Sequence, residues 1–261
     1  MLKSKLNYSG DSHNAQWEGY QVVEQQNFLD YIKNTASRRL LDQGYLNEIE
    51  SDLQGLATTG MSVDFLKEVL EDQVKYKNWE IGEALAECIL EEEENVVFPW
   101  NMLRDKRDPN ASLPGADLVG FVTIGNEIYL LIGEVKTSSQ NSAPPSVLSG
   151  RSGMVHQLEK HVEGHEKRRL IRSIIHWLHA RTKNTDYWNL FKKAIRLYLN
   201  SKGEAFALYG ILLRDTAPNE LDLKNRAKKL GTSSDELPII RLFAWYFPIP
   251  IDSWSEVIKG E

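Results

Sequence analysis

The feature that most constrains the fold is a hairpin signal near the middle of the chain. Two apolar runs, ADLVGFVTIG and EIYLLIGEVKT, meet at Gly125-Asn126. A Gly-Asn pair between two such runs is typical of a tight turn between antiparallel strands. We therefore expect two neighbouring strands that together span residues 116–137.

The turn also predicts which residues face one another. If the strands pair about Gly125-Asn126 without a bulge, Asp117 lies opposite Glu134. Alternate side chains of a strand point to the same face, so Glu134 and Lys136 share a face and Val135 points to the other. The sequence thus predicts two carboxylates and an ammonium group side by side at the end of a hairpin.

Two adjacent carboxylates repel each other, and their burial without a partner is costly. A divalent cation resolves this conflict, because Mg²⁺ prefers hard oxygen ligands and is often held by one or two carboxylates with water and phosphate oxygens. The neighbouring lysine then has a use in orienting water or in neutralising charge on a phosphate. The pattern is therefore suited to phosphodiester hydrolysis.

A purely structural explanation is the alternative. In that case Asp117 caps a turn, and Glu134 and Lys136 form a surface ion pair. An acid-X-Lys triplet alone is weak evidence, because the chain contains a second one, Asp222-Leu223-Lys224, in a polar segment with no strand before it. The combination with a hairpin and with flanking helices is what favours a catalytic site.

The remaining segments predict an α/β (α+β) fold with a central mixed sheet flanked by helices. We expect a helix around residues 24–44 in an otherwise irregular N-terminal region, one or two helices over 62–95, and a short strand near 96–103. Further strands are expected over 204–213 and 239–249, with a helix between them. We divide the chain into a partly helical N-terminal extension, 1–62, and a main domain, 63–261.

Composition and charge exclude several classes of protein. The single cysteine, Cys88, rules out an intrachain disulfide and a cysteine-based zinc site. We find neither a signal peptide nor an apolar run long enough to cross a membrane, and we expect a cytoplasmic protein. Residues 1–100 carry 8 Lys/Arg and 19 Asp/Glu, whereas residues 151–203 carry 12 and 4. Such asymmetry indicates that the basic region faces an anion.

The basic region is predicted to form two helices, over 154–180 and 184–200, that follow a phosphate backbone. The candidate nucleic-acid-binding residues are Lys160, Lys167, Arg168, Arg169, Arg172, Lys192 and Lys193. His161 and His165 have the i, i+4 spacing of a zinc site, but no third ligand lies nearby in sequence. We expect these histidines to be exposed or to face DNA.

With these residues the chain resembles the PD-(D/E)XK nuclease superfamily, which includes many restriction endonucleases. PGAD places Asp117 where the family has its aspartate, and EVK places Glu134 and Lys136 where it has its (D/E)XK pair. A strict Pro-Asp pair is absent, because Gly115 and Ala116 intervene. The resemblance covers roughly residues 79–161, with the strands at 204–214 and 238–250 extending the core.

The resemblance implies a restriction-endonuclease-like core and a set of site residues. Asp117 and Glu134 would bind Mg²⁺ or Mn²⁺, assisted by the Val135 carbonyl, and Lys136 would position water. A glutamate on the preceding helix would complete the site, and Glu83 is the first candidate, with Glu80 and Glu87 as rivals at helical spacing. Gln157, in the following basic helix, matches a glutamine that many family members carry.

Within the superfamily the chain resembles bacterial defence nucleases, such as the nuclease subunits of Hachiman anti-phage systems. That resemblance implies a DNA substrate, antiviral defence and a helicase/ATPase partner, for which the acidic N-terminal region is a natural surface. Two alternatives stay open: a restriction or repair endonuclease, and a catalytically silent module that binds nucleic acid or a partner. The sequence predicts neither substrate specificity nor the mode of cleavage.

Overall fold

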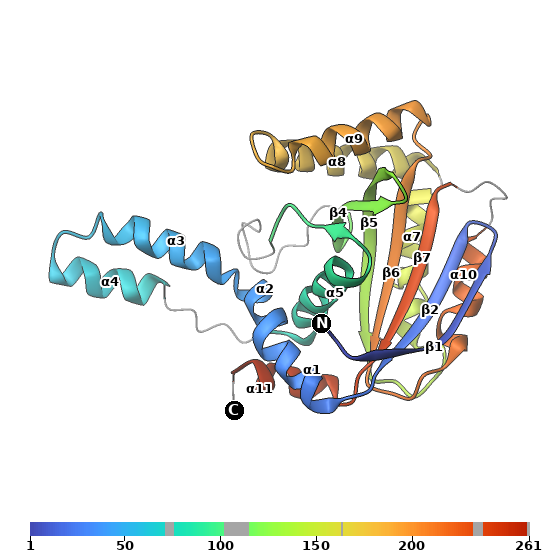
Figure 1. The fold of residues 1–261 in the computed structure, drawn as a ribbon, viewed down its shortest axis with the longest axis horizontal. Helices are drawn as coiled ribbons and strands as arrows, with labels where there is room; N and C mark the ends of the chain where they lie inside the picture. The colour runs from blue at the N-terminus through green and yellow to red at the C-terminus, as the bar shows by residue number, and fades with distance from the viewer. Residues whose placement is uncertain (71–75, 102–114, 163, 232–236, 260–261) are drawn as a thin grey trace.

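The computed structural model describes residues 1–70, 76–101, 115–162, 164–231 and 237–259. These residues form an α/β fold around a mixed seven-stranded sheet with the strand order β1-β2-β7-β6-β5-β4-β3 (Figure 1). The expected fold class, a mixed sheet flanked by helices, is confirmed. Among the helices of the described residues, none combines the length and apolar character needed to cross a bilayer.

The sheet has a parallel centre and antiparallel sides. Its strands are β1 (Ser4–Ser12), β2 (Ala15–Val22), β3 (Val96–Val97), β4 (Leu118–Ile124), β5 (Glu127–Ser138), β6 (Phe206–Arg214) and β7 (Ile239–Tyr246). β2, β7, β6 and β5 run parallel to one another. β1 pairs antiparallel with β2, and β4 pairs antiparallel with both β5 and β3. The carboxyl ends of the four central strands therefore meet at one edge, the usual place for a functional site in such sheets.

We expected an irregular N-terminal region, and this expectation is wrong for residues 4–22. These residues form the β1–β2 hairpin, and β2 pairs with β7, so the hairpin extends the central sheet. The strands escape notice in the sequence because β1 is an edge strand with no buried residue. β2 does carry a period-2 signal, since Ala15, Trp17 and Gly19 are buried in alternation with more exposed residues. The division into domains at residues 62 and 63 stays a prediction.

Helices cover both faces of the sheet. On one face lie α1 (Gln25–Tyr31), a π-helical turn (Ile32–Ala36), α2 (Ser37–Leu41), α5 (Asn78–Glu93) and α11 (Trp254–Lys259). On the other face lie α7 (Met154–Val162), α8 (Gly164–Thr182), α9 (Trp188–Asn200) and α10 (Lys224–Leu230). Two further helices, α3 (Gln43–Gln54) and α4 (Gly60–Leu70), project from this body as a pair (Figure 1). Short 3-10 helices lie at Ser146–Leu148, Glu220–Asp222 and Ile251–Ser253.

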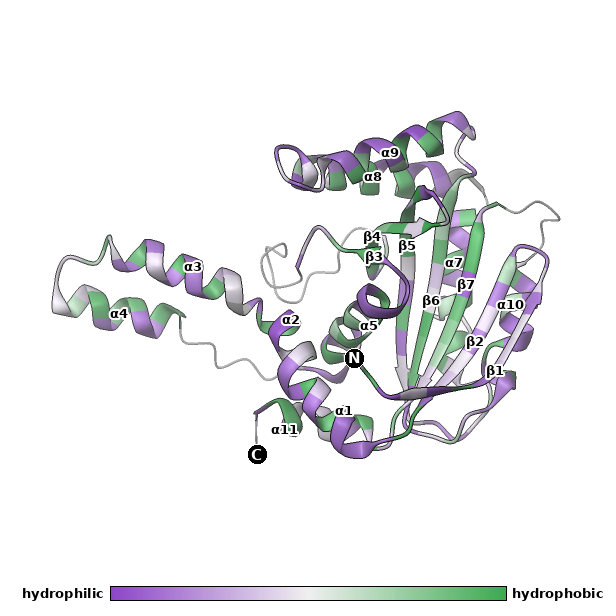
Figure 2. Cartoon of the chain, in the orientation of Figure 1, coloured by the Kyte–Doolittle hydropathy of each residue, from purple (hydrophilic) through white to green (hydrophobic). Residues whose placement is uncertain are grey.

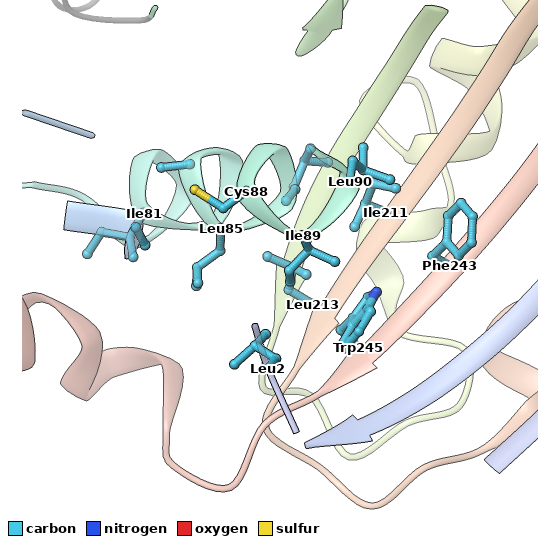
Figure 3. Packing of buried hydrophobic residues seen from close by; sticks show 14 of the residues in the cluster. Leu2, Ile81, Leu85, Cys88, Ile89, Leu90, Ile211, Leu213, Phe243 and Trp245 are labelled. Carbon is cyan, nitrogen blue, oxygen red and sulfur yellow. The ribbon is translucent and has the colours of Figure 1, made fainter. Parts of the chain in front are cut away.

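Two apolar clusters hold the layers together. On the first face, Ile89 and Leu90 of α5 lie next to Ile211 and Leu213 of β6 (Figure 3), and Ile81 and Leu85 belong to the same cluster. On the second face, α7, α8 and α9 supply apolar stripes, while their other faces are hydrophilic (Figure 2). The sheet is thus buried on both faces, which explains why its central strands read as continuous apolar runs.

Most of the predicted elements are confirmed. The helix expected around residues 24–44 corresponds to α1, the π-helical turn and α2, and the expected basic helices correspond to α7, α8 and α9. The segment 62–95 contains α4 and α5, with residues 71–75 outside the described part. The short strand expected near residues 96–103 corresponds to β3, and residues 102–103 lie outside the described part.

Gly133, on β5, is predicted to be intolerant of a side chain. A Cβ at this position would lie 2.6 Å from the backbone oxygen of Tyr209, so the strands would have to separate. Gly133→Ala should lower the free energy of unfolding by about 1–3 kcal/mol, as measured by urea denaturation. The control is Gly44→Ala in α3, where no atom lies within 4 Å of the new Cβ. Equal stabilities of the two variants would contradict this account of the packing.

Candidate active site at the end of the β4–β5 hairpin

The register of the hairpin is the one that the turn predicts. Leu118 pairs with Gly133 and Ile124 pairs with Glu127, without a bulge between them. Asp117, immediately before β4, therefore lies next to Glu134. Val119 and Phe121 belong to the α7–α9 face of the sheet, as do Ile132 and Leu130. By alternation, Asp117, Glu134 and Lys136 belong to that face too.

Three polar contacts join these residues. The Val135 amide donates a hydrogen bond to Asp117 Oδ2 at 2.9 Å. Lys136 Nζ donates to Glu134 Oε1 at 2.7 Å and lies 3.9 Å from Asp117 Oδ2. One ammonium group therefore serves two carboxylates. The ion pair of the structural explanation exists, but it is not a surface pair, since Glu134 is only 8% exposed.

The environment of Glu134 is unfavourable to its charge. Burial, together with the negative charge of Asp117, raises the pKa of Glu134 to about 7, although Lys136 opposes the shift. Two carboxylates with a single lysine leave the buried site one positive charge short. This is the electrostatic state that a further cation relieves.

Helix α7 packs on β6 next to the site. Gly210 on β6 pairs with Glu134, and a Cβ there would lie 2.8 Å from Met154 Sδ and 3.1 Å from Leu158 Cδ1 of α7. The next turn of α7 carries Gln157, whose side-chain amide donates to the Arg151 carbonyl at 2.7 Å. Lys160 Nζ donates to Gln157 Oε1 at 3.1 Å. Gln157 thus links Lys160 to the loop before α7, and its expected part in the site stays a prediction.

Helix α5 crosses the opposite face of the same strand. A Cβ at Gly82 would lie 2.5 Å from Thr137 Cγ2, so α5 touches β5 one residue beyond Lys136. Glu83 follows Gly82 and is half-buried. Of its two rivals, Glu80 caps α5 by accepting the Lys77 amide at 2.8 Å. Glu87 is buried and accepts from Arg39 Nε at 2.6 Å. The part that the resemblance implies for Glu83 in the site stays a prediction.

The donor set fits a hard divalent cation. Within the described part of the chain, no group of three or more His, Cys, Asp or Glu side chains is arranged to hold a metal ion. Asp117 and Glu134 supply two carboxylates, and the Val135 carbonyl supplies another hard oxygen next to them. Mg²⁺ commonly keeps several water or phosphate ligands, so this partial set suits it better than it suits zinc.

The second acid-X-Lys triplet is structural. Asp222 is fully buried and accepts two hydrogen bonds of 2.6 Å from Arg214 Nη1. The hydroxyl of Tyr246 donates to Asp222 Oδ2 at 2.8 Å. Lys224 points elsewhere, because its ammonium group pairs with Glu220 at 3.0 Å. The two triplets therefore differ in the residues that they contact, although their sequence pattern is the same.

Most of the candidate nucleic-acid-binding residues are accessible. Arg168, Arg169 and Arg172 are exposed on α8, and Lys192 and Lys193 are exposed on α9. Lys160 and Lys167 are the exceptions: both are half-buried, and Lys167 pairs with Glu204 at 3.0 Å. These helices overhang the β4–β5 side of the sheet (Figure 1). Their role in binding stays a prediction.

One residue of this region was misjudged from the sequence. We expected His161 to be exposed or to face DNA, but it is 2% exposed and its Nε2 lies 2.9 Å from the Gly115 carbonyl oxygen. The sequence offered one signal, since His161 follows Met154 and Leu158 at the spacing of the buried face of α7. The side chain of His165 lies outside the described residues.

The raised pKa of Glu134 predicts a pH-dependent cost in stability. Its pKa of about 7 exceeds the ordinary 4.5, so the protonated form is favoured by folding. This contribution is present below pH 4.5 and is lost as the pH rises through 7. In metal-free buffer, Glu134→Gln should therefore be more stable than the unaltered chain by about 1–3 kcal/mol at pH 8, and by less at pH 5.

Urea denaturation at both pH values measures this difference. The matched control is Glu127→Gln, at the exposed start of the same strand, which should leave the pH profile of stability unchanged. A difference between Glu134→Gln and the unaltered chain that is the same at both pH values would refute the assignment.

The sequence of the chain matches the model of a known protein family. A protein-family model described as HamA matches residues 6–240, which include the sheet apart from the start of β1 and most of β7. No curated protein matches the chain. A match over most of the length shows the family, and the chain therefore belongs to the HamA family, whose members are components of the Hachiman anti-phage defence system.

Proposed function

We propose that the chain is a Mg²⁺- or Mn²⁺-dependent nuclease of the PD-(D/E)XK type that hydrolyses DNA phosphodiester bonds in anti-phage defence. The observation that carries the proposal is the pair of the half-buried Asp117 and the buried Glu134, which shares the ammonium group of Lys136. A silent binding module has no need for a buried carboxylate whose charge is disfavoured. The same site would serve a restriction or repair endonuclease, and the family favours defence.

The residues divide the work of hydrolysis in a simple way. Asp117, Glu134 and the Val135 carbonyl would hold the cation, which supplies Lewis-acid polarisation of the phosphate when bound. The Val135 amide keeps Asp117 in place through its hydrogen bond. Lys136, held by Glu134 at 2.7 Å, would orient the attacking water or offset the charge that grows on the phosphate. Glu83 would assist from α5, and Gln157 from α7.

The basic helices give the DNA a place to bind. Five exposed cations of α8 and α9 lie on one helical pair, namely Arg168, Arg169, Arg172, Lys192 and Lys193. Contacts of this kind bind phosphates without reading sequence, so affinity should fall steeply with salt. Lys160, at Gln157, would add a cation close to the site.

The partner proposed for this chain is the helicase/ATPase of its defence system, in the cytoplasm. The α3–α4 pair offers a surface for it, because no residue of α4 is buried and α3 has none among its described side chains. Isolated helices of this length are marginal in water, so a partner is expected to cover them. Met61, Phe65 and Val69 form an exposed apolar row at i, i+4 and i+8 on α4.

Charge indicates what that partner surface looks like. Residues 42–70 carry 6 Asp/Glu and one Lys. The complementary surface is an apolar groove rimmed by lysine and arginine, into which the row on α4 would fit as helices do in grooves. The opposite side of α4 faces α3. There a hollow is lined by Val63, Leu66 and Leu70 of α4 with Glu50 and Gln54 of α3.

The nuclease proposal is tested by cleavage of plasmid and of single-stranded DNA in Mg²⁺ and in EDTA. Asp117→Asn, Glu134→Gln and Lys136→Ala should each lower the rate by about a hundredfold or more, because each removes a charge that the transition state needs. Lys224→Ala alters the lysine of the other acid-X-Lys triplet and should cut as the unaltered chain does. The assay is run with and without the helicase/ATPase.

Two outcomes would count against the proposal. Cleavage that persists in EDTA would exclude a metal-dependent site. DNA binding without cleavage under all conditions, with the helicase/ATPase included, would favour the silent binding module.

The partner surface is tested by the affinity for the purified helicase/ATPase. Phe65→Ser should weaken binding by about tenfold or more, since a buried aromatic anchor typically contributes on this scale. Leu221→Ser is the control, because Leu221 is also exposed, at 47%, but lies outside α3 and α4. An unchanged dissociation constant for Phe65→Ser would exclude the row on α4 as the docking site.

A further inference from the structure

The strongest unexplained group near the site is the imidazole of His161. It is 2% exposed in α7, and its Nε2 lies 2.9 Å from the Gly115 carbonyl oxygen. A carbonyl oxygen only accepts hydrogen bonds, so Nε2 must carry the proton. Nδ1 is then an acceptor, and it is buried with no hydrogen-bond partner among the described residues.

This arrangement is costly for a residue that only fills space. An unsatisfied buried acceptor costs free energy that a leucine of similar size would not. The imidazole is also held neutral, because burial lowers the pKa of His161 and the neighbouring Lys160 adds to the effect, while the bond to Gly115 opposes it. What the histidine adds over leucine is therefore one directed hydrogen bond to the backbone of Gly115.

Gly115 lies in the short bend that leads to Asp117 and β4. Its φ of +90° lies in the region that favours glycine, and a Cβ there would lie 3.0 Å from Leu170 Cδ2 of α8. The turn is thus pressed against α8 and bonded to α7. Asp117, two residues later, is then fixed at its side chain by the Val135 amide.

We propose that His161 is a positioning residue that fixes the Gly115–Asp117 turn, and through it the carboxylate of Asp117, in the geometry needed to bind the cation. The proposal rests on the proposed nuclease function for its purpose, but its structural content does not depend on it. Because His161 acts through the turn, it need not touch substrate or metal. A neighbour of this kind commonly alters metal affinity by about 10–100-fold when it is removed.

The experiment uses a matched pair of variants. His161→Gln keeps a donor near the place of Nε2, whereas His161→Leu keeps the volume and removes the donor. The first readout needs no metal: hydrogen exchange of the Val135 amide, which donates to Asp117 Oδ2. His161→Leu should speed the exchange of the Val135 amide about tenfold. The amides that pair β6 with β7 should exchange as in the unaltered chain. In His161→Gln, the Val135 amide should also exchange as in the unaltered chain.

A second background shows whether the effect passes through Asp117. In Asp117→Ala, the Val135 amide has already lost its acceptor, so adding His161→Leu should not speed its exchange further. If His161→Leu does not fold, Gly115→Ala strains the same turn from the other end and should speed the same amide. The second readout is Mn²⁺ affinity by calorimetry, which should fall about tenfold in His161→Leu and by less than about twofold in His161→Gln.

The outcomes separate this inference from the proposed function. Val135 exchange that is unchanged in His161→Leu overturns the positioning role, as does faster exchange throughout the whole sheet, which would show only general destabilisation. A chain that neither binds Mn²⁺ nor cuts DNA overturns the nuclease, while the exchange of Val135 still decides the role of His161. Faster exchange of Val135 with weaker Mn²⁺ binding supports both.

Discussion

The hydrogen bond from the Val135 amide to Asp117 Oδ2 is the interaction on which the site depends. Backbone pairing between β4 and β5 ends at Leu118 and Gly133. Beyond Gly133, β5 continues without β4 beside it. The Val135 amide, which points to the β4 side, would therefore lack an acceptor. A side-chain carboxylate takes the place of the missing strand. The end of the hairpin and the position of a candidate metal ligand are therefore set by the same bond.

The site is also held between two helices that approach the sheet unusually closely. Gly82 lets α5 rest on Thr137, and Gly210 lets α7 rest on the row that contains Glu134. Larger residues at either position would lift a helix off the strand and admit water. Glu134 lies on the α7 side of the sheet, and its low exposure, together with the charge of Asp117, raises its pKa. Burial and close pairing of like charges are a common way to prepare a functional carboxylate.

The sequence predicted the β4–β5 hairpin better than the β1–β2 hairpin at the edge of the sheet. The register that joins Asp117 to Glu134 follows from a two-residue turn, which is local information. The β1–β2 hairpin was missed because its edge strand has no buried residue and because its pairing with β7 joins residues more than 200 positions apart in sequence. His161 was misjudged for a similar reason, since its partner Gly115 belongs to a different segment. Glu80 and Glu87 have structural partners instead, because Glu80 caps α5 and Glu87 pairs with Arg39. Helical periodicity in the sequence predicts neither contact.

The position of β7 between β2 and β6 has a consequence for how the chain acquires its shape. Ala15 pairs with Ile240, so the sheet cannot be completed until the ribosome has released almost all of the described residues. Sheets that depend on such distant pairings form slowly, because the loss of chain entropy precedes the gain in contacts. Until then, one hydrogen-bonding edge of β6 lacks its neighbour, and the β1–β2 hairpin has no strand with which to pair. A nascent chain of this kind is exposed to aggregation and is a natural client for chaperones.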